Sequence, residues 1–95
     1  MKQTKPRGST GAELIKRWIV PNPNKPGKEE AVIRDYYVPV WALIGYLPMV
    51  NAAPEQLASG FDLPLEAVEA ALAYYARYKA FIDVRLAQNA AGGEE

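Results

Sequence analysis

Residues 60–75 read GFDLPLEAVEAALAYY, and this stretch decides the expected fold of the C-terminal half of the chain. A short helix that ends at Gly60, a brief turn and a helix that starts near Pro64 give the outline of a helix-turn-helix. In DNA-binding proteins the second helix of this motif usually reads bases. Here the outward residues at its start are Glu66 and Glu69, whose carboxylates would face phosphates. We therefore predict the motif as a scaffold and not as the main DNA reader.

Two shorter helices are predicted before this one. Pro39 suits the first turn of a helix, and apolar residues follow it at helical spacing. Pro48 is expected to end or distort that helix. Residues 54–60, PEQLASG, predict a second, very short helix with Pro54 at its start and Gly60 at the left-handed position after its end.

The third helix is predicted to run without interruption from about Pro64 to about Ala90. Its apolar residues form two adjacent stripes that span roughly 200°, which is wider than the ~100° arc of a surface helix. An apolar arc of this width favours an interface, and we expect a homodimer. The alternative is that the N-terminal hairpin covers the second stripe within one chain.

The N-terminal third predicts a basic arm followed by a hairpin. Residues 13–20, ELIKRWIV, favour a short strand, with a helical turn as the alternative. Residues 31–37, AVIRDYY, favour a second strand, and the proline-rich segment between them is a loop. The chain is thus expected to divide into a flexible basic arm (1–11), a hairpin that could form a dimer contact (12–37), a helix-turn-helix domain (38–90) and a disordered tail (91–95).

The expected fold class is therefore mainly α, a small α+β fold. An N-terminal β-hairpin precedes a three-helix helix-turn-helix domain with a long C-terminal helix. The residues expected to form its core are Trp41, Leu43, Ile44, Leu47, Leu57, Val68, Leu72 and Tyr75.

Composition excludes several classes of function. The chain has 95 residues, no histidine and no cysteine, so we expect no disulfide, no metal site and no cofactor. The carboxylates show no paired spacing and there is no phosphate-binding glycine motif, so we expect neither an enzyme nor a small-molecule substrate. No apolar run is long enough to span a membrane, and the basic N-terminus lacks the apolar region of a signal peptide. The expected location is cytoplasmic.

The net charge of zero conceals a strong asymmetry along the chain. Residues 1–34 hold eight Lys/Arg and three acids, a balance of +5, whereas residues 35–95 hold three Lys/Arg and eight acids, a balance of −5. Two solvated faces would explain this, but so would two different binding surfaces. The candidate DNA contacts are Lys2, Lys5, Arg7, Lys16, Arg17 and Arg34. The candidate partner or dimer contacts are Tyr36, Tyr37, Tyr74, Tyr78, Phe81 and Arg85, most of them aromatic residues of the kind that interfaces favour.

Residues 32–47, VIRDYYVPVWALIGYL, and 53–83, APEQLASGFDLPLEAVEAALAYYARYKAFID, resemble the bacterial and archaeal family called domain of unknown function 433. Members of that family typically carry a segment similar to V-I-R-G-T-R-I-P-V, and later a segment similar to L-T-x-E-D-V-x-A-A-L-x-Y-Y. The chain departs from the family where Asp35, Tyr36 and Tyr37 replace G-T-R, and where Pro64 replaces the capping threonine.

The resemblance implies a helix-turn-helix protein, often the antitoxin of a toxin–antitoxin pair whose toxin is a small nuclease of the PIN type. The acidic half of the chain suits a basic nuclease cleft. The first hypothesis is thus an antitoxin-like protein that binds a toxin and also contacts DNA through its basic residues. The alternatives are a dimeric helix-turn-helix regulator, which the shortage of base-reading side chains over residues 60–75 disfavours, and an interaction domain without a nucleic-acid role.

Overall fold

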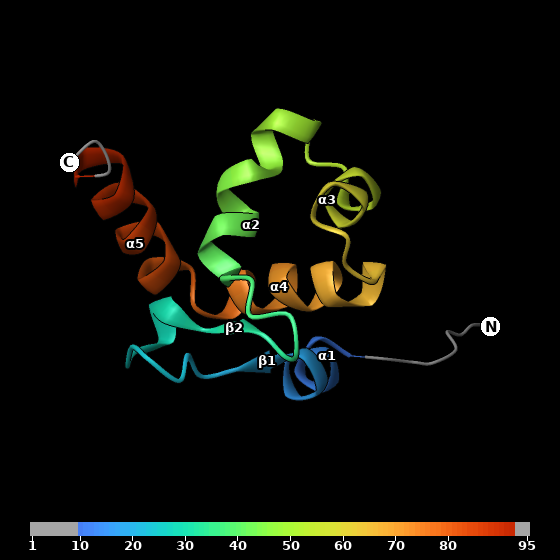
Figure 1. The fold of residues 1–95 in the computed structure, drawn as a ribbon, viewed down its shortest axis with the longest axis horizontal. Helices are drawn as coiled ribbons and strands as arrows, with labels where there is room; N and C mark the ends of the chain where they lie inside the picture. The colour runs from blue at the N-terminus through green and yellow to red at the C-terminus, as the bar shows by residue number, and fades with distance from the viewer. Residues whose placement is uncertain (1–9, 93–95) are drawn as a thin grey trace.

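Helices make up most of residues 10–92, the part of the chain that this computed structural model describes (Figure 1). The elements in chain order are α1 (Gly11–Trp18), β1 (Ile19–Val20), the 3₁₀ turn η1 (Lys28–Glu30), β2 (Val32–Ile33), α2 (Val40–Tyr46), the 3₁₀ turn η2 (Leu47–Val50), α3 (Pro54–Phe61), α4 (Leu65–Arg77) and α5 (Lys79–Gly92). The prediction of a mainly α fold with a small N-terminal hairpin is confirmed. Most of the predicted arm and tail lies outside the described residues.

Helix α1 corrects the prediction of a strand over residues 13–18. The Thr10 hydroxyl accepts a hydrogen bond from the Glu13 N–H at 3.1 Å, and the Glu13 carboxylate accepts one from the Thr10 N–H at 3.2 Å. This reciprocal pair is a capping box, which satisfies two N–H groups at the start of a helix. The Thr-x-x-Glu spacing is visible in the sequence, and it outweighs the strand preference of the Ile and Trp residues that follow.

The predicted hairpin exists but is short. β1 and β2 are antiparallel with two residues each, and Ile19 lies opposite Ile33. The predicted second strand ends at Ile33 because the chain then turns back, with left-handed backbone at Asp35 (φ 70°) and Tyr37 (φ 59°). The N–H of Tyr37 donates to the Ile33 carbonyl at 2.7 Å, which closes this turn. Residues 34–37 are therefore a tight turn and not strand.

Prolines lie at the starts of α2, α3 and α4, as predicted. Pro39 and Pro64 occupy the positions just before α2 and α4, and the prediction that Pro48 distorts the first of these helices is confirmed, because η2 follows α2 there. One detail was wrong. Gly60 lies inside α3, and the left-handed position after the helix belongs to Asp62 (φ 59°). Aspartate tolerates this conformation better than most side chains do.

The predicted long third helix is interrupted at Tyr78, which separates α4 from α5. Tyr78 has φ −120° and ψ 39°, outside the helical region, although its N–H still donates to the Tyr74 carbonyl. The sequence around the break holds neither proline nor glycine, so nothing local indicates it. After the break α5 turns to pack on α2, and Ile82 becomes fully buried. Burial of this side chain in the core gives a physical reason for the bend.

Helix α4 lies at the centre of the fold. Val68 and Ala71 point into the core that α4 shares with α2 and α3. Glu66, Ala70 and Ala73, spaced four and three residues apart, share the opposite face of the helix. That opposite face is covered by α1, which packs on α4 more extensively than any other helix does (Figure 1). The helix is thus enclosed from two sides.

The core combines the predicted residues with others from the hairpin and α5. Among the predicted residues, Leu43, Ile44, Leu57 and Val68 are buried, and Trp41, Leu47, Leu72 and Tyr75 are half-buried against the same cluster. The residues that the core contains in addition are Ala31, Ile33, Val40, Ala58, Leu63, Ala67, Ala71, Tyr74 and Ile82. The hairpin therefore covers part of the second apolar stripe of α4, as the single-chain alternative required.

Candidate functional site

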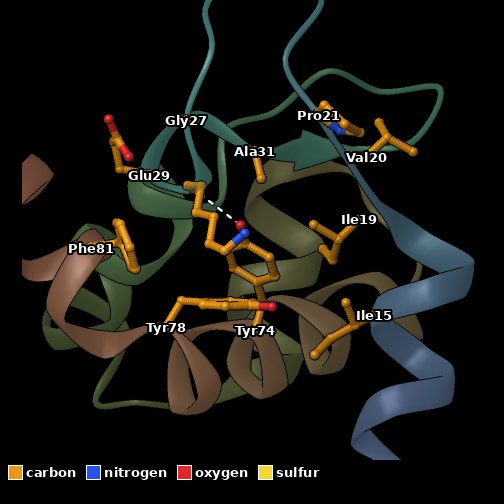
Figure 2. A pocket seen from close by; sticks show the side chains of 11 residues that line it. Ile15, Ile19, Val20, Pro21, Gly27, Glu29, Ala31, Tyr74, Tyr78 and Phe81 are labelled. Carbon is orange, nitrogen blue, oxygen red and sulfur yellow. Dashed lines mark hydrogen bonds between the residues drawn. The ribbon is translucent and has the colours of Figure 1, made fainter.

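An open groove of about 580 Å³ lies between the hairpin, α1 and the junction of α4 with α5 (Figure 2). Ile15 and Ile19 form one side, Phe81 the other, and the rings of Tyr74 and Tyr78 lie between them. The remaining lining residues are Val20, Pro21, Gly27, Lys28, Glu29 and Ala31. The lining is mostly aliphatic and aromatic, with one cation and one carboxylate, which suits the side chains of a protein partner better than a charged small molecule.

Aromatic stacking fixes the Tyr78 end of the groove. The Tyr74 and Tyr78 ring centroids lie 4.7 Å apart, and the Tyr78 and Phe81 centroids lie 6.2 Å apart in an edge-to-face arrangement. The Lys28 ammonium lies 5.2 Å from the Tyr78 ring centroid, within the range of a cation–π contact. Phe81 nevertheless remains 47% exposed, and Val84, one turn further along α5, is 56% exposed. An apolar surface thus continues from the groove onto α5.

The sequence predicts that Tyr74 lies at an interface, but its side chain is only 6% exposed and belongs to the core of the single chain. Its hydroxyl donates to the Lys28 backbone carbonyl at 2.7 Å, which fastens η1 to α4. Burial, assisted by the neighbouring Tyr78 and Glu29, raises the pKa of Tyr74 from 10.0 to about 12. The phenol therefore stays neutral, and able to donate, over the whole neutral range.

The raised pKa of Tyr74 predicts a loss of stability in alkali. Above pH 10.0 the unfolded chain releases this proton, whereas the folded chain keeps it until about pH 12. The free energy of unfolding should therefore fall as pH rises through this window, and Tyr74 should contribute nothing to the pH dependence below it. Denaturant titrations at several pH values should show a steeper alkaline fall for the wild-type chain than for Tyr74→Phe. Parallel curves for the two proteins would refute the assignment.

Three of the candidate DNA contacts lie in the described residues, and these three meet at the C-terminal end of α1. The Arg34 guanidinium donates to the Arg17 carbonyl at 2.8 Å and to the Lys16 carbonyl at 3.3 Å, so it caps this helix end. Lys16, Arg17 and Arg34 are all exposed and form one basic cluster. Lys2, Lys5 and Arg7 lie outside the described residues.

Glu66 holds α1 against α4. Its Oε1 accepts hydrogen bonds from Arg17 Nη1 at 2.8 Å and from Trp18 Nε1 at 3.1 Å. At the other end of α1, Gly11 approaches α4 so closely that a Cβ there would lie 3.3 Å from the Ala73 Cβ. The acidic start of α4 therefore has an intramolecular explanation, since Glu66 binds the helix that covers it. The sequence could not indicate this partnership, because Arg17 and Glu66 are 49 positions apart.

The other interface candidates lie at three separate places. Tyr36 and Tyr37 are exposed on the turn that follows β2, and Tyr78 and Phe81 line the groove. Arg85 instead points inward from α5, and its Nε lies 2.9 Å from the Glu30 Oε2 in an ion pair whose side chains are only 16% and 15% exposed. Its guanidinium also stacks on Trp41 at 4.2 Å from the ring centroid. Sequence reasoning missed Glu30 and Lys28, both in a segment that looked like plain loop.

The described residues hold no group of three acidic, histidine or cysteine side chains that would bind a metal ion. None of their helices is both long and apolar enough to cross a membrane. What the described residues do offer is the groove, the basic cluster and the exposed apolar residues of α5.

The comparison with known families gives one match. The family model described as "Protein of unknown function (DUF433)" matches residues 26–75, which include η1, the hairpin's second strand, α2, α3 and most of α4. The chain belongs to the DUF433 family. The match ends within α4, so the end of α4 and all of α5 lie beyond it. No significant match was found among curated proteins or among solved structures.

Within this DUF433 protein, the matched segment supplies all of the buried core cluster except Ile82, together with one wall of the groove. Lys28, Glu29 and Tyr74 fall inside the matched range, whereas Tyr78, Phe81 and the α1 residue Ile15 fall outside it. The groove is thus completed by helices on both sides of the family segment.

Proposed function

We propose that this DUF433 protein is an antitoxin-like binding protein whose partner is a small nuclease of the PIN type. It acts by occupying the partner and not by catalysis. The observation that carries the proposal is the apolar surface formed by Tyr78, Phe81 and Val84 beside an open groove. Exposed aromatic residues next to a concave apolar site are typical of protein-binding surfaces.

Charge supports the same partner class. The balance of −5 over residues 35–95 complements a basic nucleic-acid-binding cleft. Glu55, Asp62 and Glu69 are exposed carboxylates on α3, on the turn after it and on α4. A chain with this surface competes with nucleic acid for a nuclease while also placing its apolar groove residues against the nuclease surface.

DNA contact is a secondary part of the proposal. The basic cluster of Lys16, Arg17 and Arg34 would bind phosphates, with an affinity that falls as salt rises and that depends little on base sequence. The alternative of a base-reading regulator is disfavoured, because α1 covers the face of α4 that carries Ala70 and Ala73. The face that α4 leaves exposed carries Leu65 and Glu69, which are not the side chains that usually read bases in the major groove.

The test is co-expression of the chain with the product of the neighbouring reading frame, followed by purification and a nuclease assay. We expect a complex, with cleavage of a nucleic-acid substrate suppressed at equimolar chain. Phe81→Asp should weaken this inhibition at least tenfold, because a carboxylate would be desolvated in an apolar contact. Leu65→Asp is the matched control, since Leu65 is also an exposed apolar residue but lies at the far end of α4.

Three outcomes would contradict the proposal: no complex, a partner without nuclease activity, or equal effects of the two aspartate variants. The same preparations, titrated with unrelated DNA duplexes at several salt concentrations, test the secondary part. A strong preference for one duplex would favour the regulator instead.

A further inference from the structure

We propose that α5 exchanges between two copies of the chain, with Tyr78 as the hinge, so that each copy's α5 packs on its partner's α2 and η1. The occupant of this surface is thus a second copy of the same chain. The inference does not depend on the function proposed above. Domain swapping of this kind gives a dimer at low energetic cost, because both copies reuse contacts that the single chain already makes.

The hinge is a single residue. Residues on both sides of Tyr78 are helical, and only its φ of −120° and ψ of 39° depart from helix. The segment Arg77–Ala80 contains no proline or glycine, so its local preference is to continue α4 into α5. A change of two backbone torsions at Tyr78 would straighten the two helices into one, and it would carry α5 away from its own chain.

One hydrogen bond belongs to the bent form. The Tyr75 hydroxyl donates to Asp83 Oδ1 at 2.7 Å, across the break. In a straight helix residues eight positions apart are separated by about 12 Å along the axis, and helical side chains lean toward the N-terminus. This bond would therefore be lost on straightening, whereas the ion pair of Lys79 with Asp83 is spaced four residues apart and fits either form. The Tyr75 hydroxyl thus stabilises the bent form over the straight one.

The contacts that α5 makes after the hinge are specific. Ile82 is fully buried, Arg85 pairs with Glu30 and stacks on Trp41, and Leu86 fits closely over Gly45, where a Cβ would lie 3.1 Å from its Cδ2. When α5 moves away from its own chain, it uncovers a site that fits an isoleucine, a guanidinium and a leucine at fixed spacing. A second copy of α5 supplies that set.

α5 does not pack on α2 along its whole length. A groove of about 490 Å³ opens between α2 and α5, lined in part by Tyr46, Met49 and Asn89. The two helices diverge toward the C-terminal end of α5 (Figure 1). Besides the Tyr75–Asp83 hydrogen bond, the contacts that exchange must replace are those of Ile82, Arg85 and Leu86, and a second copy can supply all three at high protein concentration.

Charge reversal of the buried ion pair tests the exchange directly. Glu30→Arg alone brings two guanidinium groups together, and Arg85→Glu alone brings two carboxylates together. In a dimer of one Glu30→Arg chain and one Arg85→Glu chain, exchange of α5 places opposite charges at positions 30 and 85 in both copies of the contact. Without exchange, both clashes remain. The double variant Glu30→Arg/Arg85→Glu is the matched control, since it restores an ion pair within one chain and between two copies.

The two single variants should be refolded together and analysed by native mass spectrometry and circular dichroism. Random pairing would make half of all dimers heterodimers, and we expect a fraction well above that. The dissociation constant of the heterodimer should be at least tenfold lower than that of either variant's homodimer. If a single variant does not fold by itself, recovery of the helical signal on mixing is the supporting result. A mixture that behaves as the sum of its parts, while the double variant folds, would overturn the proposal.

The hydrogen bond between Tyr75 and Asp83 gives a second, independent test of exchange. Tyr75→Phe should raise the dimer fraction of the otherwise unchanged chain in light scattering, whereas Tyr36→Phe, which alters an exposed tyrosine far from the hinge, should not. A wild-type chain that stays monomeric at ~100 μM, together with a Tyr75→Phe variant that does the same, would also overturn exchange.

Discussion

Replacement of Leu43 with alanine is expected to lower the free energy of unfolding by about 2–5 kcal/mol. Leu43 is fully buried in α2, where it packs in the cluster that joins α2, α3 and α4. The loss combines the transfer free energy of the removed methyl groups with the cavity that remains, because the neighbouring helices relax only in part. For a domain of this size it would remove a large share of a total stability of roughly 5–14 kcal/mol.

Leu65→Ala is the matched control for Leu43→Ala. It makes the same chemical change at the first residue of α4, but Leu65 is 38% exposed and a cavity there is open to water. We expect a cost of less than about 1 kcal/mol, measured by denaturant titration followed by circular dichroism. Equal costs for the two variants would mean that α2 does not contribute to the core as described.

The second large effect is expected from Glu30→Ala. This change leaves the Arg85 guanidinium without its carboxylate while its side chain is only 16% exposed. Removal of one partner of a buried ion pair typically costs about 3–5 kcal/mol, and we expect a value near the lower limit because some solvent reaches the pair. Loss of this pair should also weaken the attachment of α5, so amide exchange should accelerate in α5 more than in α2.

Two further variants separate the buried pair from ordinary surface charge. Lys79→Ala breaks an ion pair whose side chains are 65% and 42% exposed, and it should leave the free energy of unfolding nearly unchanged, because water screens the two charges. Glu30→Leu with Arg85→Met removes both charges and should recover most of the stability that Glu30→Ala loses. If the double variant is as unstable as Glu30→Ala, the packing of α5 depends on the guanidinium stacked on Trp41 more than on the ion pair.

The candidate groove could be predicted only in part. Tyr78 and Phe81 were identified from the excess of apolar residues on the predicted third helix, and both line the groove. Tyr74 has the same residue type and lies one turn earlier, yet it is buried under η1. Periodicity assigns a residue to a face of a helix, but it does not indicate which distant segment covers that face. Lys28 entered the groove without any sequence signal, because a proline-rich loop carries no periodic pattern.

The sequence by itself determined the local features. Pro39, Pro48, Pro54 and Pro64 set the helix boundaries through the fixed φ and missing N–H of proline, which act within a turn of the chain. Thr10 and Glu13 likewise define the start of α1 by a capping box, although strand preference obscured it. The family membership rests on the same short-range order of residues over 26–75.

The tertiary structure decided the rest, because it depends on contacts between residues that are far apart in the chain. The break at Tyr78 has no helix breaker beside it and coincides with the burial of Ile82 in the core. The position of α1 over α4 depends on Glu66, which accepts hydrogen bonds from residues 48 and 49 positions away. The ion pair of Glu30 with Arg85 spans 55 positions. Such contacts form only when packing brings their elements together, so no local pattern encodes them.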